Sequence, residues 1–535
     1  MPEQDLRQKK LLGGVAVLMP AALFTKIVGL CYKIPLIAIV GVSGMAYFLA
    51  AYHVYSVVFV LSATGLPTAL SLLVARLAAK GEGTAPRRAL GVALLLFLSV
   101  GLCGTAALWC LAPFLAERIA MADAAAAIMA IAPALLLAAF TGAVKGYFQG
   151  LHRMLPTALC EVLEAAGKLG FGLWFALLAK GRGLPPPLVA AYAIFGITAG
   201  LALAALVLGV WLLIHLLGHR QKGEGTPPPR RALLGELCRV ALPITANSLV
   251  MSLATLLDTA LISGRLQAAG FAPEVANGMY SAYGNLAMPL YNLVPALLAP
   301  VNLSLMPLLG TAFSKGDVKG GREVLSGAMR LTALLSIPAA LGLAVFAEPL
   351  LELIYGSAGA AVATAAPLLS LLALSVLPVT LLTLLGAALQ AVGHTVLPVI
   401  AMGVGALVKL LAECLLLSLP AVQIYGAPIS TLLCNLTVLV IEAIALSRVL
   451  SGAALSPGAL FRPLLASAPA VAAGAALYIV LQRQIPFAIL PALLLTVCLF
   501  ALLALRTGAL CAGDLAALPM GDRLYILLCK CKLMK

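Results

Sequence analysis

The sequence has little charge and few aromatic residues. Only 10 % of its 535 residues are charged and 6 % are aromatic, whereas 63 % are hydrophobic and the mean hydropathy is +1.11. Soluble chains carry about 25 % charged residues, so this composition excludes an ordinary soluble protein. Long apolar runs of helix length instead predict an all-α polytopic membrane protein, since a helix satisfies its own backbone groups in lipid.

Sequence motifs of several function classes are missing. There is no Walker A pattern for ATP hydrolysis, and no CxxC pair or Cys/His cluster with the spacing of a zinc site. The 11 cysteines lie mostly in apolar segments and are interpreted as small core residues. The five histidines are scattered, and His53 is interpreted as an ordinary polar helix residue. We therefore expect no enzyme activity, no cofactor and no metal.

Fourteen hydrophobic segments are long enough to cross a bilayer, which takes about 20 apolar residues. The N-terminal MPEQDLRQKK lacks a cleavable signal pattern, so the first segment is expected to be retained. Prolines such as Pro133 and Pro378 interrupt many segments and predict kinks. The predicted spans are 13–40, 45–78, 88–113, 125–148, 155–179, 187–217, 232–262, 278–313, 323–347, 361–389, 396–419, 426–447, 463–482 and 486–505.

The net charge of +15 is spread over many short loops, which excludes a nucleic-acid interface. Most lysines and arginines fall in loops on the side of the N-terminus. The loops of the other side hold only Arg118, Lys180, Arg182, Arg265 and Arg483. Positive charge gathers on the cytoplasmic side of membrane proteins, so both termini are predicted to be cytoplasmic.

The second half of the chain repeats the first at a shift that grows slowly. Pro20 matches Pro243, Gln149 matches Gln390 and Lys168 matches Lys409. Six spans separate the copies, so both face the same way, as in two-lobed transporters. The predicted domains are an N-lobe (1–219), a cytoplasmic linker (220–231), a C-lobe (232–450), two extra helices (451–507) and a basic amphipathic tail (508–535).

Two lysines lie inside the first span. Lys26 and Lys33 are seven residues apart, so a helix places them on one face. A cation at mid-membrane costs roughly 2.5–3.5 kcal/mol on insertion scales. We expect this stripe to line a polar cavity; snorkelling to the two interfaces is the alternative, and it suits Lys33 better than Lys26.

Other buried charges occur in both halves. Glu164 and Lys168 are spaced i,i+4 and are able to neutralise each other, as are Lys409 and Glu413 in the equivalent eleventh span. These two pairs, together with Glu161 and Asp258, are candidates for gating or ion coupling; Glu442 in the twelfth span is a further buried charge. The repeat register places Lys33 near the depth of Asp258, which predicts a Lys–Asp gate across a central cavity.

With these residues, the chain resembles the MOP superfamily of exporters and, within it, the MurJ/SpoVB branch of polysaccharide biosynthesis proteins. The resemblance covers nearly the whole chain. It is carried by the layout of six, six and two spans and by four segments: FTKIVGLCYKIPL (24–36), GLPTALSLLVA (65–75), KGYFQGLHRMLP (145–156) and LLDTALISGRL (256–266).

The resemblance implies a MATE-like fold and a bacterial cytoplasmic-membrane protein that flips undecaprenyl-linked sugars. The family's cavity residues correspond to Lys26, Lys33, Asp258 and Arg265, of which Lys26, Lys33 and Arg265 would bind the substrate. MurJ-type flippases typically have further arginines on the second and eighth helices. Here the second span has no arginine or lysine before Arg76, and the eighth has none before Lys315. This difference favours the SpoVB-like side of the family and leaves the identity of the glycolipid open.

The leading hypothesis is a flippase for an anionic lipid-linked oligosaccharide or lipid II-like peptidoglycan precursor. It would work by alternating access, in cell-wall or spore-envelope synthesis, with Na⁺, H⁺ or the membrane potential as energy source. The alternative is a MATE-like antiporter for organic cations, which requires an acidic N-lobe cavity. A scaffold without transport is a third class, and it leaves Lys26 unexplained.

Overall fold

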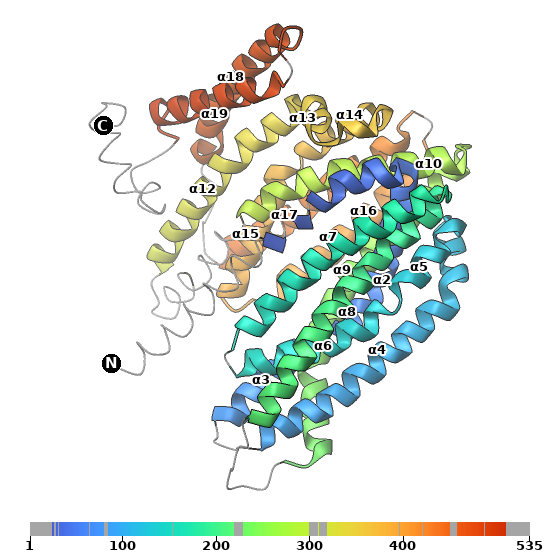
Figure 1. Cartoon of the computed structure of the whole chain (residues 1–535). Helices are drawn as coiled ribbons and strands as arrows, with labels where there is room; N and C mark the ends of the chain where they lie inside the picture. Colours follow the sequence, from blue (N-terminus) through green and yellow to red (C-terminus); the bar gives the residue numbers. More distant parts are fainter. Residues whose placement is uncertain are drawn as a thin grey trace. The chain divides into compact units, whose positions relative to one another are not determined.

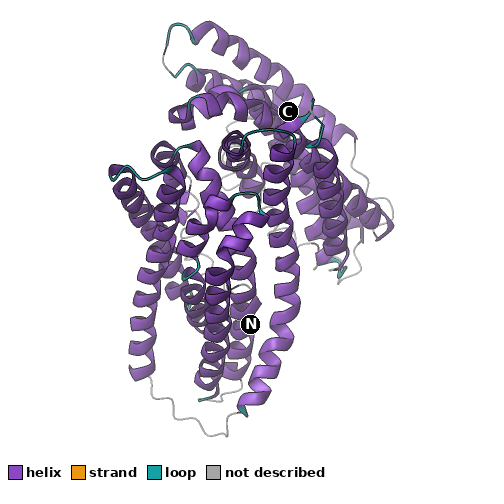
Figure 2. Cartoon of the chain, turned by 90° about the vertical axis from the view of Figure 1, so that its right-hand side faces the viewer, coloured by secondary structure: helices purple, strands orange, loops and turns teal. Residues whose placement is uncertain are grey.

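The part of the chain that the structure describes is helical throughout and contains no strand (Figure 2). The structure is a computed structural model. It describes residues 24–25, 28–29, 31–63, 65–79, 84–151, 153–218, 228–298, 309, 318–394, 396–419, 421–449, 457–485 and 487–509. The predicted all-α class is confirmed. Lys26, most of the predicted linker and the predicted tail from residue 510 onward lie outside the described residues.

The chain divides into two compact units, Met1–Ser281 and Ala282–Lys535. Figure 1 labels helices of both units. The first unit begins with the short helix Cys31–Val40. It continues with α2 (Val42–Ala63), α3 (Gly65–Ala79), α4 (Ala85–Arg118), η1 (Ala122–Ala124), α5 (Ala125–Ile131), α6 (Ala134–Gly150), α7 (Leu155–Gly181), α8 (Pro186–Gly218), α9 (Arg230–Ala268) and α10 (Pro273–Ser281). Its core includes the buried side chains of Leu70, Phe97 and Phe148 from α3, α4 and α6.

The second unit starts with one π-helical turn, η2 (Ala282–Ala287). It continues with α12 (Val318–Val345), α13 (Ala347–Tyr355), η3 (Gly356–Ala358), α14 (Ala360–Ala373), α15 (Val376–Ala391), α16 (Val396–Leu416), η4 (Gln423–Tyr425), α17 (Gly426–Val449), α18 (Pro457–Leu481) and α19 (Ile489–Arg506). Met329, Leu385 and Leu446 share one buried cluster, which joins α12, α15 and α17.

Ten helices of the described part are long and apolar enough to cross a membrane, or eleven if the bent pair α14 and α15 is one span. The ten helices and the bent pair together fall on eleven of the fourteen predicted spans. The remaining three are the first, the seventh and the eighth. The first and the eighth run into residues outside the described part, and a continuous helix, α9, occupies the seventh.

Helices break at a glycine with a positive φ and near two prolines. Gly41 has a φ of +80°, a left-handed conformation that suits glycine, and it separates the helix Cys31–Val40 from α2. Helix α5 ends two residues before Pro133, and α14 and α15 meet at an angle of 46° just before Pro378. Proline has no N–H to donate to the carbonyl four residues earlier, so it weakens the preceding turn.

Helices α7 and α8 pack at very short distance through facing glycines. A Cβ on Gly167 would lie 2.5 Å from the Gly200 Cα, and one on Gly196 would collide with the Gly172 backbone. Small residues allow this approach, which gives helix contact in lipid. Gly172 also faces the Tyr32 ring, because a Cβ there would lie 2.6 Å from the Tyr32 hydroxyl. The glycines thus hold α7 against both α8 and the first span.

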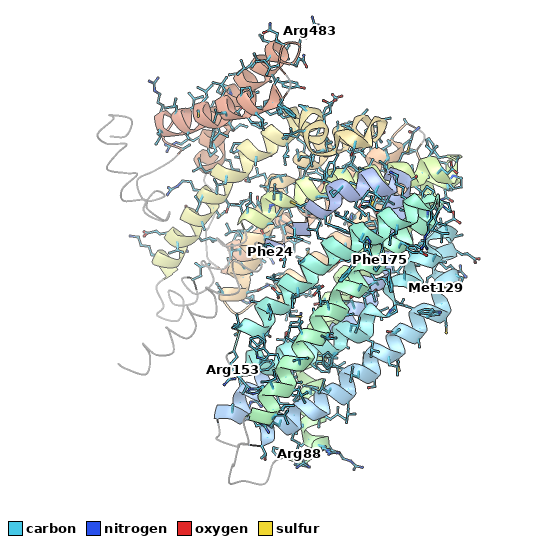
Figure 3. The ribbon with its side chains drawn as sticks, in the orientation of Figure 1. Phe24, Arg88, Met129, Arg153, Phe175 and Arg483 are labelled. Atoms are coloured by element: carbon cyan, nitrogen blue, oxygen red, sulfur yellow. The ribbon has the colours of Figure 1, made fainter. Side chains whose placement is uncertain are left out.

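The boundary between the compact units lies after α10, beyond the linker that the repeat predicted as the lobe boundary. Helix α9 packs against α2 and α3 and therefore clusters with the first six spans. The lobes defined by the repeat stay a prediction. Arg88 and Arg153, both predicted to be cytoplasmic, lie at the same end of the first unit (Figure 3).

Candidate functional site

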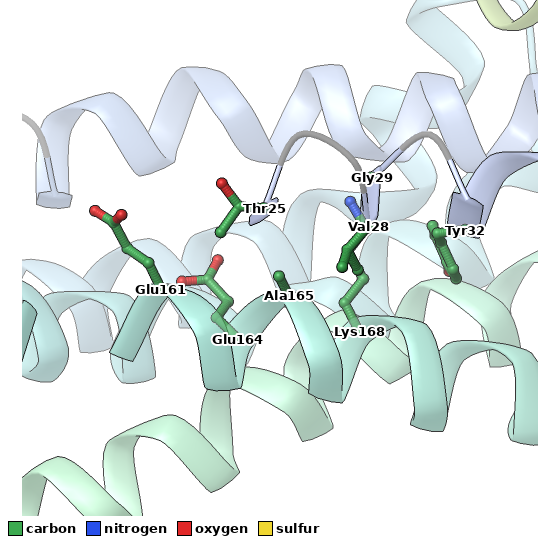
Figure 4. Close-up of a pocket in the computed structure, with 8 residues that line it drawn as sticks. All are labelled: Thr25, Val28, Gly29, Tyr32, Glu161, Glu164, Ala165 and Lys168. Carbon is green, nitrogen blue, oxygen red and sulfur yellow. The ribbon is translucent and has the colours of Figure 1, made fainter. Parts of the chain in front are cut away.

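A cavity of about 270 Å³ lies between the first predicted span and α7 in the first unit. One wall is made by Thr25, Val28, Gly29 and Tyr32, and the other by four residues of α7: Glu161, Glu164, Ala165 and Lys168 (Figure 4). The spacing of Glu161, Glu164 and Lys168 places all three on one face of α7. The cavity therefore carries two carboxylates and one amine.

The Lys168 amine lies between two tyrosine rings. Its Nζ is 5.3 Å from the centre of the Tyr32 ring and 5.7 Å from that of Tyr52. Tyr32 is fully buried, and its hydroxyl donates a hydrogen bond to the Ala193 carbonyl at 3.3 Å, which fixes the ring. Cation–π contacts of this kind stabilise by about 0.5–2 kcal/mol. The tyrosines thus position the amine at the cavity wall.

Glu164 and Lys168 form no ion pair with each other in the described structure, although they are spaced i,i+4. The amine contacts the rings of Tyr32 and Tyr52. Lys33 lies within electrostatic range of Lys168 and repels it. The cavity therefore brings one amine and two carboxylates together without a close ion pair between Glu164 and Lys168.

The equivalent pair in the second unit forms as predicted. Lys409 Nζ lies 3.7 Å from Glu413 Oε1 within α16, and the Glu413 side chain is fully buried. The Ser430 hydroxyl of α17 donates a hydrogen bond to the same oxygen at 3.1 Å. This buried carboxylate is thus held by one amine and one hydroxyl. The pair joins α16 to α17, and a role in gating or ion coupling stays a prediction.

Two other predicted residues lie on α9, away from the cavity. Asp258 is half-buried beside Thr259, and Arg265 is exposed in the last turn of the helix. Lys33 and Asp258 form no ion pair in this structure, so the predicted gate contact is not made here. The gate, and the substrate-binding role of Lys26, Lys33 and Arg265, stay predictions.

A hydrogen-bond network joins α2, α9 and α10 in the first unit. The His53 Nδ1 lies 2.7 Å from the Thr259 hydroxyl and 3.2 Å from the Tyr280 hydroxyl, and these two hydroxyls are 3.0 Å apart. The network thus gives His53 hydrogen-bond partners on two other helices.

The same three helices share a second set of polar contacts. Ser263 donates to Asn277 Oδ1 at 3.1 Å, and Asn277 donates to the Tyr47 hydroxyl at 3.4 Å. Tyr47 in turn donates to Asp123 at 3.4 Å. Polar groups inside apolar helices require partners, so these contacts fix how the three helices pack.

The sequence predicted the charged residues of α7 but not the aromatic residues that contact Lys168. Tyr32 directly precedes Lys33, and Tyr52 lies on the next helix, so no spacing rule on one helix connects either ring to Lys168. The signal available from the sequence is Tyr32 directly beside Lys33, because an aromatic ring next to an intramembrane lysine indicates a cation–π contact in this region. In the described part, no group of three or more His, Cys, Asp and Glu residues is able to hold a metal ion.

The family described as "Polysaccharide biosynthesis protein" matches residues 11–313, and the MatE family matches residues 276–415. Stage V sporulation protein B of Bacillus subtilis (strain 168) is 25 % identical over 455 residues, which cover 83 % of this chain and 85 % of that protein.

Two solved structures share the fold. The lipid II flippase MurJ in an inward closed conformation has a TM-score of 0.69 at 14 % identity, covering 91 % of this chain and 98 % of that one. An inward-facing multidrug resistance MATE transporter of the MOP superfamily has a TM-score of 0.65 at 17 % identity, covering 80 % and 98 %. The MATE-like fold expected from the resemblance is confirmed.

Proposed function

The chain belongs to the polysaccharide biosynthesis protein family, and from this premise we propose that it is a flippase for an anionic lipid-linked glycan. The substrate class is an undecaprenyl-linked oligosaccharide or a lipid II-like peptidoglycan precursor, moved across the cytoplasmic membrane by alternating access. The relatives named above as a sporulation protein and a lipid II flippase support this class. The protein acts as a transporter rather than as an enzyme.

The Lys168 amine is the observation that carries the proposal. It lies at the wall of a cavity, between Tyr32 and Tyr52, with no ion pair to the carboxylates beside it. Lys33 adds a second amine within electrostatic range. A lipid-linked sugar carries phosphate next to its polyprenyl chain, and lysine binds phosphate as a point charge. The head group enters the cavity while the polyprenyl tail stays in lipid.

The same cavity supports a second candidate function. Glu161 and Glu164 line it beside Lys168, and the alternative of a MATE-like antiporter required acidic residues in this region. The MatE match over residues 276–415 and the fold shared with a multidrug transporter also fit this alternative. An organic cation would bind the carboxylates, whereas a phosphate would bind the amines.

Two matched substitutions on α7 separate these functions. Purified protein is titrated with an undecaprenyl diphosphate-linked sugar and with ethidium as an organic cation. For the flippase, Lys168→Gln weakens binding of the glycolipid at least about tenfold, since a hydrogen bond to a charged group contributes about 1.5–3 kcal/mol. Glu164→Gln leaves that binding unchanged or tightens it.

The opposite pattern identifies the antiporter. In that case Glu164→Gln abolishes ethidium binding, and Lys168→Gln has no effect on the glycolipid. Flipping of a fluorescent glycolipid in liposomes then measures transport directly. A wild-type protein that binds the glycolipid but does not flip it would contradict the proposed function.

A further inference from the structure

Glu442 is a buried acidic residue that the cavity does not include. It lies on α17 in the second unit and is only 3 % exposed. Its Oε2 atom is buried and has no hydrogen-bond partner, and the structure holds no ion pair of this side chain among the described residues. An ionisable side chain inside a membrane helix is costly and usually serves a function.

The surroundings of Glu442 are apolar. Its Oε1 atom faces Gly386 of α15, where a Cβ would lie only 3.1 Å away, so the missing side chain of the glycine leaves room for the carboxyl group. One turn before and after it on α17, Leu439 and Leu446 pack in the cluster that contains Leu385 and Leu389 of α15. Among the described residues, the carboxyl group thus lies beside hydrocarbon side chains of α15 and α17.

Charged residues on the neighbouring helices form no ion pair with Glu442. Helices α14 and α15 carry no ionisable side chain. Among the described residues, the other ionisable side chains of the surrounding segments are Lys409, Glu413 and Cys414 on α16, Cys434 and Arg448 on α17 itself, Tyr283 and Tyr291, which bond to Thr431 and Asn435 of α17, and Lys319, Arg322, Glu323 and Arg330 on α12, which packs on α15.

Glu413 shows how the same unit holds a charged carboxylate. That side chain is also buried, and it is paired with Lys409 and accepts a hydrogen bond from Ser430. Glu442 has neither contact. A carboxylate without partners in an apolar site takes up a proton rather than remain charged. This difference in contacts predicts a difference in protonation between the two glutamates.

We propose that Glu442 is a proton-binding site and carries a neutral carboxylic acid in the conformation described here. When α15 moves relative to α17 and water reaches the site, the acid gives its proton to water and becomes a carboxylate. The proposed ligand is a proton, and in the described part no group of three or more His, Cys, Asp and Glu side chains is able to hold a metal ion. The inference does not rest on the proposed transport function.

Infrared difference spectroscopy of the full-length protein in liposomes at neutral pH tests the inference. Subtracting the spectrum of Glu442→Gln from that of the wild type should leave the C=O stretch of a protonated carboxylic acid, and the band should shift in heavy water. Glu413→Gln is the matched control, since it removes a paired carboxylate and should leave the acid band intact.

Two results would overturn the proposal. One is a difference spectrum for Glu442→Gln that shows only carboxylate bands. The other is an acid band that disappears in Glu413→Gln instead. If Glu442→Gln does not fold, Glu442→Asp serves in its place, because it keeps the acid and should move the band to the position of a protonated aspartic acid. An unmoved acid band in Glu442→Asp would equally contradict the assignment.

Discussion

The Nδ1 atom of His53 lies 2.7 Å from the hydroxyl oxygen of Thr259, although 206 residues separate them. The contact joins the second predicted span to the seventh, which are the second span of one repeat and the first span of the other. Tyr280 of α10 bonds to both side chains. One hydroxyl therefore connects three helices, and its loss should loosen all three.

Thr259→Val tests this connection. The substitution keeps the shape of the side chain but removes the hydroxyl, so His53 and Tyr280 each lose a partner. His53 and Tyr280 keep their bond to each other, and the net contribution of one lost hydrogen bond is about 0.5–1.5 kcal/mol. We expect thermal unfolding in detergent to begin at a clearly lower temperature than in the wild type.

Thr437→Val provides the control for this experiment. The Thr437 hydroxyl donates to the Leu433 carbonyl of its own helix at 2.7 Å and joins no second helix. This variant should therefore melt close to the wild type. Equal destabilisation by both variants would show that the His53 network does not hold the helices together.

The helical fold was predictable from the sequence because apolar runs of membrane length lie in lipid, which offers no hydrogen-bond partners. The backbone N–H groups of such a run must therefore bond to carbonyls of the same helix. The sites of kinks were predictable only in part. Helix breaks occur near Pro133 and Pro378, whereas Pro338 lies within the continuous helix α12. Whether a proline breaks a helix depends on how neighbouring helices satisfy the freed carbonyl, and a single sequence does not contain that information.

The candidate site was predictable from the high cost of burying charge, which identified Glu161, Glu164 and Lys168. The partners of these residues were not predictable. The sequence favoured neutralisation of Lys168 by Glu164 one turn away, but the structure places tyrosines from two other helices around the amine. Residue spacing in the sequence predicts only which side chains are neighbours on the same helix. Contacts between helices depend on how the helices pack, for example on the packing of Gly172 against Tyr32.

Gly167→Ala should destabilise the first unit, because the added methyl group collides with the Gly200 backbone. Overpacking of this kind costs about 1–3 kcal/mol. Gly170→Ala is the matched control on the same helix, since nothing lies within 4 Å of its Cβ position. Replacing a helical glycine by alanine in open space should stabilise by about 0.5–1 kcal/mol. Detergent melting curves of the two variants should therefore move in opposite directions, and a shift of both in the same direction would contradict the packing argument.

Two substitutions of Tyr32 separate the role of its ring from the role of its hydroxyl group. Tyr32→Phe keeps the ring that faces the Lys168 amine and loses only the hydrogen bond to the Ala193 carbonyl. Tyr32→Leu removes the ring as well. If the ring positions the amine for an anionic ligand, Tyr32→Leu should weaken glycolipid binding by about threefold to tenfold, in line with the strength of a cation–π contact. Tyr32→Phe should bind nearly as well as the wild type, and equal binding by both variants would exclude this role of the ring.

The Lys409–Glu413 pair predicts strong coupling between two substitutions. Lys409→Met leaves the fully buried Glu413 carboxylate with Ser430 as its remaining partner among the contacts described above. Breaking one side of a buried ion pair costs about 3–5 kcal/mol, because the other charge stays in an apolar environment.

Replacing both residues removes that charge, and apolar replacements of buried pairs are often neutral. The double variant Lys409→Met, Glu413→Leu should therefore be more stable than Lys409→Met alone, although it carries one more substitution. Melting temperatures of the wild type, both single variants and the double variant form a complete double-mutant cycle. Additive shifts would show that the two side chains do not interact and that the 3.7 Å separation contributes nothing to stability.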